Sequence, residues 1–594
     1  TMRYLKPLMG QNFLEYASYV IKDRAIPDIE DGLKPVQRRI LHTMNEIDDG
    51  KFNKVANIVG DTMKLHPHGD AAIGSALVVM ANKEYVIEKQ GNFGNLLTGD
   101  PASASRYIEA RLTPLAKETI FNPELTEFVD SYDGRNKEPV VLPCKLPISL
   151  LFGAEGIAVG MSTRILPHNF NEIIDAQIAF LQNKSFKLLP DFLSRGMLDS
   201  SEYEDGNGKV RVRAKIEITD DKLLTVRELP FGVTTESLIQ SIQDAVNKGK
   251  FKLSSIDNFT AEAVEIELKA ARGMDAEKLL KLLYAFTQCE VSISVNMLLI
   301  QDNQPVQLNT SEVLKCNTLR LKDLLKQELM LSLKQTKKKW HQRRMEMYFI
   351  GEKLYNKLET CDSYEEAIEM VRKAVHHIES ILPFQIEQED IEKLLTLQIK
   401  RITRYDQKES QKELDKLKIK ISSINKSLKN ITGYTISYLE KIKEKYGSDY
   451  PRRTRIKNFD EIRVQDVAEK QKVVWDRKEG FLGLNVKQGS TSIFCSAYDK
   501  ILVIRNDGTY QVVRVPEKQF IGKNAISVEK LDSKKVHNIV YWEGKSKVCY
   551  AKRFRVEKFI IEREYKLFPF KKGAKILHLS YGDGIRVETF FVPR

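Results

Sequence analysis

The stretch that decides how this chain is interpreted runs from Gly91 to Arg111 and reads GNFGNLLTGDPASASRYIEAR. Its glycines, asparagines and proline predict a loop, and near its end Tyr107 directly follows Arg106. A tyrosine that attacks a phosphodiester needs a cation beside it, because negative charge grows on the phosphoryl oxygens in the transition state. Arginine keeps its charge and can hold two phosphate oxygens at once. The pair therefore indicates phosphoryl transfer, although an Arg-Tyr dipeptide alone is also typical of an ordinary protein surface.

Four further motifs flank this stretch. In chain order they are DGLKPVQRR at 31–39, KLHPHGD at 64–70, GAEGIAVGM at 153–161 and ILPHN at 165–169. Together with the stretch around Tyr107, they resemble the A subunit of a bacterial type IIA DNA topoisomerase, the gyrase and topoisomerase IV family. The resemblance is dense from about residue 10 to about residue 175 and looser, but in register, to about residue 455.

The motif at 64–70 also predicts a local structure. Asp70 is a suitable N-cap, so we expect a helix over residues 71–80, with His66 and His68 just ahead of its first turn. The first N–H groups of a helix are free and carry a partial positive charge, which makes such a helix end a ready site for a DNA phosphate.

The 594 residues are enough for several domains, and the sequence pattern changes along the chain. Short helical patterns with Gly and Pro come first, then apolar strands such as 210–218 and 223–229, then a long, charged helical region. We therefore expect a multidomain α+β fold. The resemblance implies four parts: a winged-helix DNA-cleavage domain (1–145), an α+β tower (146–315), a coiled-coil C-gate dimerisation domain (316–455) and a partial, basic β-pinwheel that binds DNA (456–594).

Six apolar residues in the helical region follow a 3-4-3-4-3 spacing, which is typical of a heptad seam: Leu414, Leu417, Ile421, Ile424, Leu428 and Ile431. The lysine-rich stretch 334–344 is predicted to be the opposing long helix, with a small globular tip around 362–402. Such an antiparallel hairpin would match the family's C-gate, where two copies of the A chain meet. An amphipathic helix packed within its own domain would show the same seam.

The tail contains a repeat. Strand–turn–strand patterns begin at Ile501, Ile539 and Ile576, a period typical of propeller blades, and residues 473–484 are a candidate fourth unit. Residues 461–594 carry 27 Lys and Arg against 16 Asp and Glu, and the whole chain has a net charge of +13, which suits a polyanionic partner. The tail resembles the family's pinwheel, either small and open or cut short at Arg594.

The resemblance also implies roles for individual residues. Tyr107 is expected to be the nucleophile that forms a transient bond to the 5′ phosphate of a cut strand, and Arg106 to stabilise the phosphoryl charge. Ile165 is expected to be the apolar wedge that inserts between base pairs and bends the DNA, although a core isoleucine is the ordinary alternative. The remaining residues expected to contact the gate DNA are Arg24, Lys34, Arg38, Arg39, His66, His68, Gln90 and Asn92.

The chain contains neither a Gly-x-x-x-x-Gly-Lys-Ser/Thr loop for ATP nor a clear carboxylate set for magnesium, so no metal site is predicted in it. The resemblance implies that a B subunit holds both ATP and Mg²⁺, and that a homodimer of this chain acts on double-stranded DNA within an A2B2 particle. That particle would be an ATP-dependent type IIA topoisomerase, passing one duplex through a transient double-strand break. Six cysteines without a Cys-x-x-Cys pair indicate neither a zinc site nor a disulfide framework. The lack of a long apolar run predicts a cytoplasmic protein with no membrane insertion, and the resemblance implies that it is chromosome-associated.

Two departures from the family pattern refine the prediction. Ala71 and Ser75 stand where many members carry a serine and an acidic residue that anchor quinolone drugs, so weak quinolone poisoning is expected. The tail lacks a Gln-Arg-Arg-Gly-Gly-Lys-Gly box, which favours topoisomerase IV-like relaxation and decatenation over negative supercoiling by a gyrase. Two other functions stay open: a non-enzymatic DNA-binding scaffold, and a metal-dependent nickase in which His66 and His68 bind a cation.

Overall fold

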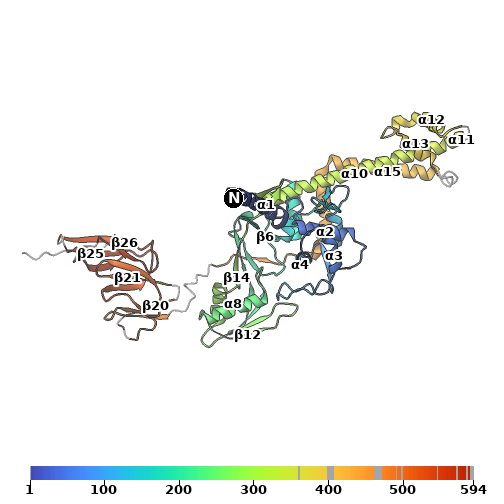
Figure 1. Cartoon of the computed structure of the whole chain (residues 1–594). Coiled ribbons are helices and arrows are strands. Elements are labelled where there is room, and N and C mark those ends of the chain that lie inside the picture. The colour runs from blue at the N-terminus through green and yellow to red at the C-terminus, as the bar shows by residue number, and fades with distance from the viewer. Residues whose placement is uncertain are drawn as a thin grey trace, which may run out of the picture. The chain divides into compact units, whose positions relative to one another are not determined.

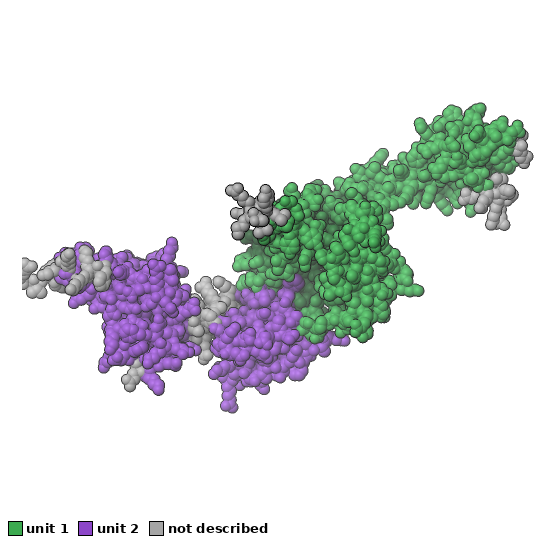
Figure 2. Space-filling model, viewed as in Figure 1, with its two compact units in different colours: residues 1–212, 292–458 green, residues 213–291, 459–594 purple. Residues whose placement is uncertain are grey.

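In a computed structural model of the chain, residues 2–358, 361–397, 407–460 and 471–588 are described, apart from 488, 490, 497–498, 545, 547, 570–572, 584–585 and 587. This part of the chain is a mixed α+β protein with long helices (Figure 1). It divides into two compact units, residues 1–212 with 292–458 and residues 213–291 with 459–594 (Figure 2). None of the helices in the described ranges is long and apolar enough to cross a membrane.

Three short helices and a small sheet form the N-terminal core of the first unit. The helices pack against one another and are α2 (Pro35–Glu46), α3 (Val55–Thr62) and α4 (Asp70–Ala81). The antiparallel sheet has the order β1-β3-β2, with β1 (Asn53–Lys54), β2 (Ile87–Gln90) and β3 (Glu109–Leu112). Apolar side chains from the helices, such as Ile40, Ile58 and Leu77, are fully buried. Because β3 begins two residues after Tyr107, this core fixes where the tyrosine stands.

Helix α4 confirms the predicted helix over residues 71–80 but begins one residue earlier. The N-cap is Gly69, with extended backbone (ψ 146°), and Asp70 is already helical. The prediction of Asp70 as N-cap is therefore wrong. Its carboxylate instead lies in the first helical turn, where the helix dipole favours a negative charge.

A long N-terminal helix and several short elements complete this core. The helix α1 (Met2–Val20) continues into a π-helical turn, η1 (Ile21–Ala25). The following elements are α5 (Pro114–Thr119), the hairpin β4 (Phe128–Asp130) and β5 (Lys137–Pro139), α6 (Ile148–Phe152), the hairpin β6 (Ala154–Ile157) and β7 (Ser162–Ile165), α7 (Phe170–Leu181) and β8 (Met197–Asp199). Later in the chain, β15 (Leu298–Gln301) pairs with β16 (Gln304–Gln307), and β17 (Arg455–Ile456) pairs with β8.

Two long helices pair in the same unit, as the heptad seam predicts. Helix α10 (Thr310–Gly351) packs against α15 (Gln407–Lys429), which α16 (Ile431–Tyr446) follows. The pair is antiparallel, because Arg343 of α10 bonds to Glu413 while Trp340, earlier in α10, lies 5.8 Å from the Lys418 ammonium. Ile431, the last predicted seam position, belongs to α16 rather than to α15.

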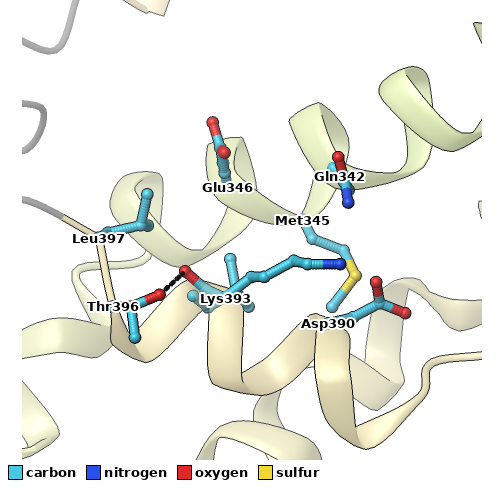
Figure 3. A pocket seen from close by; sticks show the side chains of 8 residues that line it. Gln342, Met345, Glu346, Asp390, Lys393, Thr396 and Leu397 are labelled. Atoms are coloured by element: carbon cyan, nitrogen blue, oxygen red, sulfur yellow. Dashed lines mark hydrogen bonds between the residues drawn. The ribbon is translucent and has the colours of Figure 1, made fainter.

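A small helical tip lies at the far end of α10 (Figure 1). It contains α11 (Leu354–Lys357), α12 (Tyr364–Val375) and α13 (Gln388–Leu395), whose apolar faces share one core with Met345 and Phe349. A cavity of about 420 Å³ lies between α10 and α13. Met345 and Lys393 are among the side chains that line it (Figure 3). The predicted tip at 362–402 is therefore helical where it is described, and residues 398–402 lie outside the described ranges.

The first part of the second unit is an antiparallel sheet with two helices. The sheet has the order β10-β11-β13-β12 and contains β10 (Lys215–Asp220), β11 (Leu223–Glu228), β12 (Leu253–Asn258) and β13 (Ile266–Ala270). The helices are α8 (Thr235–Asn247) and α9 (Ala276–Phe286), each with one buried apolar face. Strands β9 (Lys209–Arg213) and β14 (Glu290–Ser294) lie where the chain passes between the units. The predicted strand at 223–229 is confirmed as β11, whereas the predicted strand at 210–218 is divided at Ala214 into β9 and β10, which belong to different sheets.

Where it is described, the tail contains three antiparallel sheets with a shared strand order. They are β20-β18-β19-β23, β24-β21-β22-β27 and β28-β25-β26. The first sheet contains β18 (Gln471–Asp476), β19 (Phe481–Gly483), β20 (Thr491–Cys495) and β23 (Gln519–Phe520). The second contains β21 (Lys500–Arg505), β22 (Thr509–Arg514), β24 (Ala525–Lys530) and β27 (Glu564–Lys566). The third contains β25 (His537–Glu543), β26 (Val548–Phe554) and β28 (Lys575–Tyr581). The candidate unit at 473–484 is therefore a real sheet.

The third predicted repeat is wrong in part. Residue Ile576 lies on β28, which pairs with β25 and so closes the preceding sheet instead of opening a new one. The connection between β26 and β28 is long, so β28 begins about as far along the chain from the start of β25 as a new repeat unit would. The second strand of that repeat, at 585–592, lies largely outside the described residues.

Candidate nucleic-acid interface

Tyr107 lies in a tight turn immediately before β3. Its side chain is 65% exposed, and its backbone N–H donates to the carbonyl oxygen of Ala104 at 2.9 Å. Arg106 is also exposed, and its guanidinium carbon lies 4.6 Å from the centre of the Tyr107 ring. The phenol is therefore open to a ligand, with a permanent cation directly beside it.

The backbone on both sides of Tyr107 is held by the helices. The N–H of Val55, the first residue of α3, donates to the Ile108 oxygen at 3.0 Å, and the N–H of Ala56 donates to the Ser105 oxygen at 3.1 Å. Helix α4 approaches the same turn closely, because a Cβ built on Gly74 would lie 3.2 Å from the Ser105 hydroxyl oxygen. The tyrosine thus combines a fixed backbone with an exposed side chain.

The loop before Tyr107 folds back on itself beside the turn. Gln90 ends β2 and pairs in register with Glu109 of β3. Asn92 accepts two bonds that shape the loop, from the N–H of Ser103 to its carbonyl at 3.0 Å and from the N–H of Gly94 to its side-chain oxygen at 2.8 Å. Gly94 has φ +80°, and a Cβ there would lie 2.6 Å from the Asp100 oxygen, so this close approach requires glycine.

His66 is held in one protonation state by an arginine. Arg39 lies 2.5 Å and 3.1 Å from the two carboxylate oxygens of Glu138 and directs another N–H to Nδ1 of His66 at 2.8 Å. Since a guanidinium only donates, Nδ1 must accept and the proton of neutral His66 sits on Nε2. Burial, the Arg39 charge and nearby His68 and Arg24 lower the pKa of His66 to about 4, so this histidine is a neutral donor near neutral pH.

His68 has a neighbour that the sequence did not suggest. Its ring meets that of His66 edge-on, with centroids 4.6 Å apart. Its Nε2 lies 2.6 Å from the hydroxyl of Tyr19, which comes from the end of α1. Tyr19 and His68 are separated by 49 residues, so no local sequence pattern could have found this pair.

The remaining predicted cations differ in exposure and in the bonds that hold their side chains. Arg24 is exposed on η1, and Lys34, the N-cap of α2, donates to the Glu155 carbonyl oxygen at 2.6 Å. Arg38 is buried and holds the fully buried Asp31 with two bonds, at 2.6 Å and 2.9 Å. Arg38 therefore stabilises the start of α2 from inside and does not present its charge to the surface.

The structure contradicts the wedge role predicted for Ile165. Its side chain is 3% exposed at the base of the β6–β7 hairpin, so it cannot insert into DNA. Ile157, near the tip of the same hairpin, is 83% exposed. The hairpin is fixed against η1, since a Cβ on Gly156 would lie 2.1 Å from the Ala25 oxygen. Ile157 was missed because both isoleucines lie in matching motifs, and only burial distinguishes them.

These surfaces all belong to the first unit and combine cations, donors and one exposed apolar side chain. Comparison with known proteins shows the family of the chain. The sequence profile that describes the A subunit of DNA gyrase/topoisomerase IV matches residues 24–440. The chain belongs to the A-subunit family of DNA gyrase and topoisomerase IV. A second profile, described as the topoisomerase C-terminal domain of Bacteroidota, matches residues 472–594.

The chain matches different shares of the length of individual members of this A-subunit family. The A subunit of DNA topoisomerase 4 from Borreliella burgdorferi is 44% identical over 567 residues, which are 95% of this chain and 90% of that protein. The A subunit of DNA gyrase from Leptospira biflexa is 32% identical over 74% of this chain and 55% of that protein, and the one from Clostridium acetobutylicum is 32% identical over 78% and 59%. The similarity therefore extends over nearly the whole length of the topoisomerase IV protein and over little more than half of either gyrase protein.

Proposed function

We propose that this chain is the subunit that cleaves and rejoins DNA in a topoisomerase IV-like type IIA topoisomerase. The observation that carries the proposal is the exposed Tyr107 beside Arg106 on a fixed turn, in a chain that belongs to this family. Tyr107 attacks a backbone phosphate and leaves the enzyme joined to a 5′ end. Arg106 stabilises the charge that grows on the phosphoryl oxygens.

The other site residues bind and shape the DNA around the break. Arg24, Lys34 and Arg39 supply positive charge, and Gln90 and Asn92 form the loop beside the tyrosine. His66 and His68 lie before the N-terminus of α4, where free N–H groups attract a phosphate. Arg38 positions the start of α2 through Asp31. Ile157 replaces Ile165 as the proposed wedge between base pairs.

The four parts expected from the sequence remain the proposed organisation. Helices α2 to α4 with their small sheet support a winged-helix cleavage domain at 1–145. The sheet with α8 and α9 supports a tower at 146–315, and the antiparallel helices with their tip support a C-gate at 316–455. The three basic tail sheets support a partial pinwheel at 456–594.

Magnesium and ATP are proposed to bind mainly to a B subunit. Among the residues that the structure describes, no three His, Cys, Asp or Glu side chains are grouped so as to hold a metal ion. When bound by a partner near the scissile phosphate, Mg²⁺ would neutralise charge on the phosphate. This chain would contribute the tyrosine, the cations and the DNA-shaping surfaces, as a homodimer within an A2B2 particle on the chromosome in the cytoplasm.

His66 argues against the nickase alternative. A metal-binding histidine needs a ring nitrogen with a free lone pair, but Nδ1 of His66 accepts a bond from Arg39 and the proton of the neutral ring sits on Nε2. The scaffold alternative differs in its prediction for the tyrosine, because Tyr107→Phe would then leave all activity intact.

The choice between topoisomerase IV and gyrase can be tested directly. The purified chain is combined with a cognate B subunit, Mg²⁺ and ATP, and offered either catenated circles or relaxed plasmid. We expect unlinking of the circles and no negative supercoils. Negative supercoiling of the relaxed plasmid would instead establish the gyrase alternative.

A further inference from the structure

We propose that Tyr19 is a positioning residue for His68, and that its hydroxyl holds the imidazole in the tautomer that donates from Nδ1 to a DNA phosphate. The inference rests on the proposed function, because it assigns His68 to the DNA interface. Tyr19 itself is not expected to touch the reacting atoms.

The contact between the two side chains is short and specific. The Tyr19 hydroxyl lies 2.6 Å from Nε2 of His68, and the ring centroids are 6.4 Å apart and tilted by 44°. The oxygen therefore meets the ring nitrogen, and the two rings are not stacked. If the hydroxyl donates to Nε2, the imidazole proton must sit on Nδ1. That nitrogen then offers a donor, which is what a phosphate oxygen needs.

Tyr19 is well placed for this role because the end of α1 is anchored. The next residue, Val20, is buried with Ala25, Ile26 and Ile300 in one apolar cluster. By contrast, the preceding part of α1 exposes large apolar side chains such as Phe13 and Leu14. The π-helical turn that follows carries Arg24, whose charge reaches His66. The end of α1 and η1 thus serve both histidines.

The two histidines are consequently fixed by different partners. Arg39 forces the neutral His66 proton onto Nε2, whereas Tyr19 would place the His68 proton on Nδ1. Their rings meet edge-on, so the orientation of one limits that of the other. His66 is buried, at 6% exposed, so His68 is the more accessible of the two ahead of α4, and without the tyrosine hydroxyl only His66 would remain fixed.

The test is a double-mutant cycle in the complete enzyme with its B subunit. Tyr19→Phe removes only the hydroxyl, His68→Gln removes the imidazole, and Tyr16→Phe is the matched control on the same helix, 57% exposed. The measurement is the single-turnover rate of covalent complex formation on plasmid DNA with Mg²⁺. Because one hydrogen bond is lost, we expect Tyr19→Phe to slow cleavage by about 3- to 10-fold, with Tyr16→Phe unchanged.

The double variant shows whether the Tyr19 hydroxyl acts through the His68 imidazole. Since the hydroxyl acts through the imidazole, Tyr19→Phe should cause no further loss in the His68→Gln background. Wild-type rates in Tyr19→Phe or His68→Gln, or an equal further loss in the double variant, would overturn the inference. A ¹⁵N-histidine spectrum of the chain, with His68 assigned from His68→Gln, reads the tautomer without any activity. If wild type forms no covalent complex, the proposed function fails. If the spectrum shows that Nε2 of His68 is protonated, or if Tyr19→Phe leaves the spectrum unaltered, the positioning role of Tyr19 fails.

Discussion

Replacing Ile157 by alanine is expected to weaken binding to bent gate DNA by about 50-fold. The side chain is 83% exposed in the free protein, so nearly all of its apolar surface can be buried on insertion between base pairs. The substitution removes three carbon atoms, and at about 0.8 kcal/mol for each the loss is about 2.4 kcal/mol. One factor of ten in affinity corresponds to about 1.4 kcal/mol.

Ile165 provides the matched control at the other end of the same hairpin. It is 3% exposed, so it has no surface left to bury against DNA. Ile165→Val is expected to cost about 0.5–1.5 kcal/mol of folding stability and to leave DNA affinity and bending unchanged.

Both variants are compared on one duplex that carries a fluorophore near each end. Energy transfer reports bending, and a titration at one fixed salt concentration reports affinity, because phosphate contacts make affinity salt-dependent. Bending and affinity of Ile157→Ala equal to wild type would refute the wedge role. A loss in Ile165→Val alone would show that the hairpin acts through its packed base.

Three further predictions concern nearby residues. Arg38→Met leaves Asp31 buried without its cationic partner, although the N–H groups of Leu33 and Leu142 still donate to it. This should destabilise the first unit by about 3–5 kcal/mol and lower its melting temperature, while the salt dependence of DNA binding stays the same. Burial and neighbouring positive charge lower the pKa of His66 from 6.5 to about 4. Between these values the unfolded chain binds the proton and the folded chain does not, so stability falls as the pH drops from 6.5 to 4. His66→Gln should flatten that slope in melts over a pH series. Ala71 and Ser75 lie exposed one turn apart on α4, and cleavage assays with quinolones should show weak stimulation; strong breaks at low drug concentration would contradict this.

Patterns set by neighbours in the chain could be predicted from the sequence. The loop before Tyr107 follows from its glycines and asparagines, and the helix at 71–80 from a capping residue ahead of a helical run, although the cap is Gly69 and not Asp70. The heptad spacing predicts a long helix with an apolar seam, whereas the antiparallel partner is what the resemblance implies. In each case the deciding interactions lie within about one or two turns of the chain, or repeat along it.

Features set by distant contacts could not be predicted. Ile157 and Ile165 are chemically identical, and only the packing of the hairpin base makes one core and the other surface. Arg38 resembles any cation of a basic motif until its bond to buried Asp31 is seen. The pairing of β28 with β25 could not be predicted, because the long connection before β28 places Ile576 at the same spacing as the start of a new repeat unit.

Covalent trapping tests the central claim most directly. The chain and its Tyr107→Phe variant are each mixed with a cognate B subunit, Mg²⁺ and supercoiled plasmid, and the reactions are stopped with detergent and protease. We expect linear DNA with peptide attached at its 5′ ends in the wild-type reaction and none with Tyr107→Phe. Equal cleavage by the variant, or no protein-linked DNA with wild type under any partner or metal condition, would contradict the assignment of Tyr107 as the nucleophile.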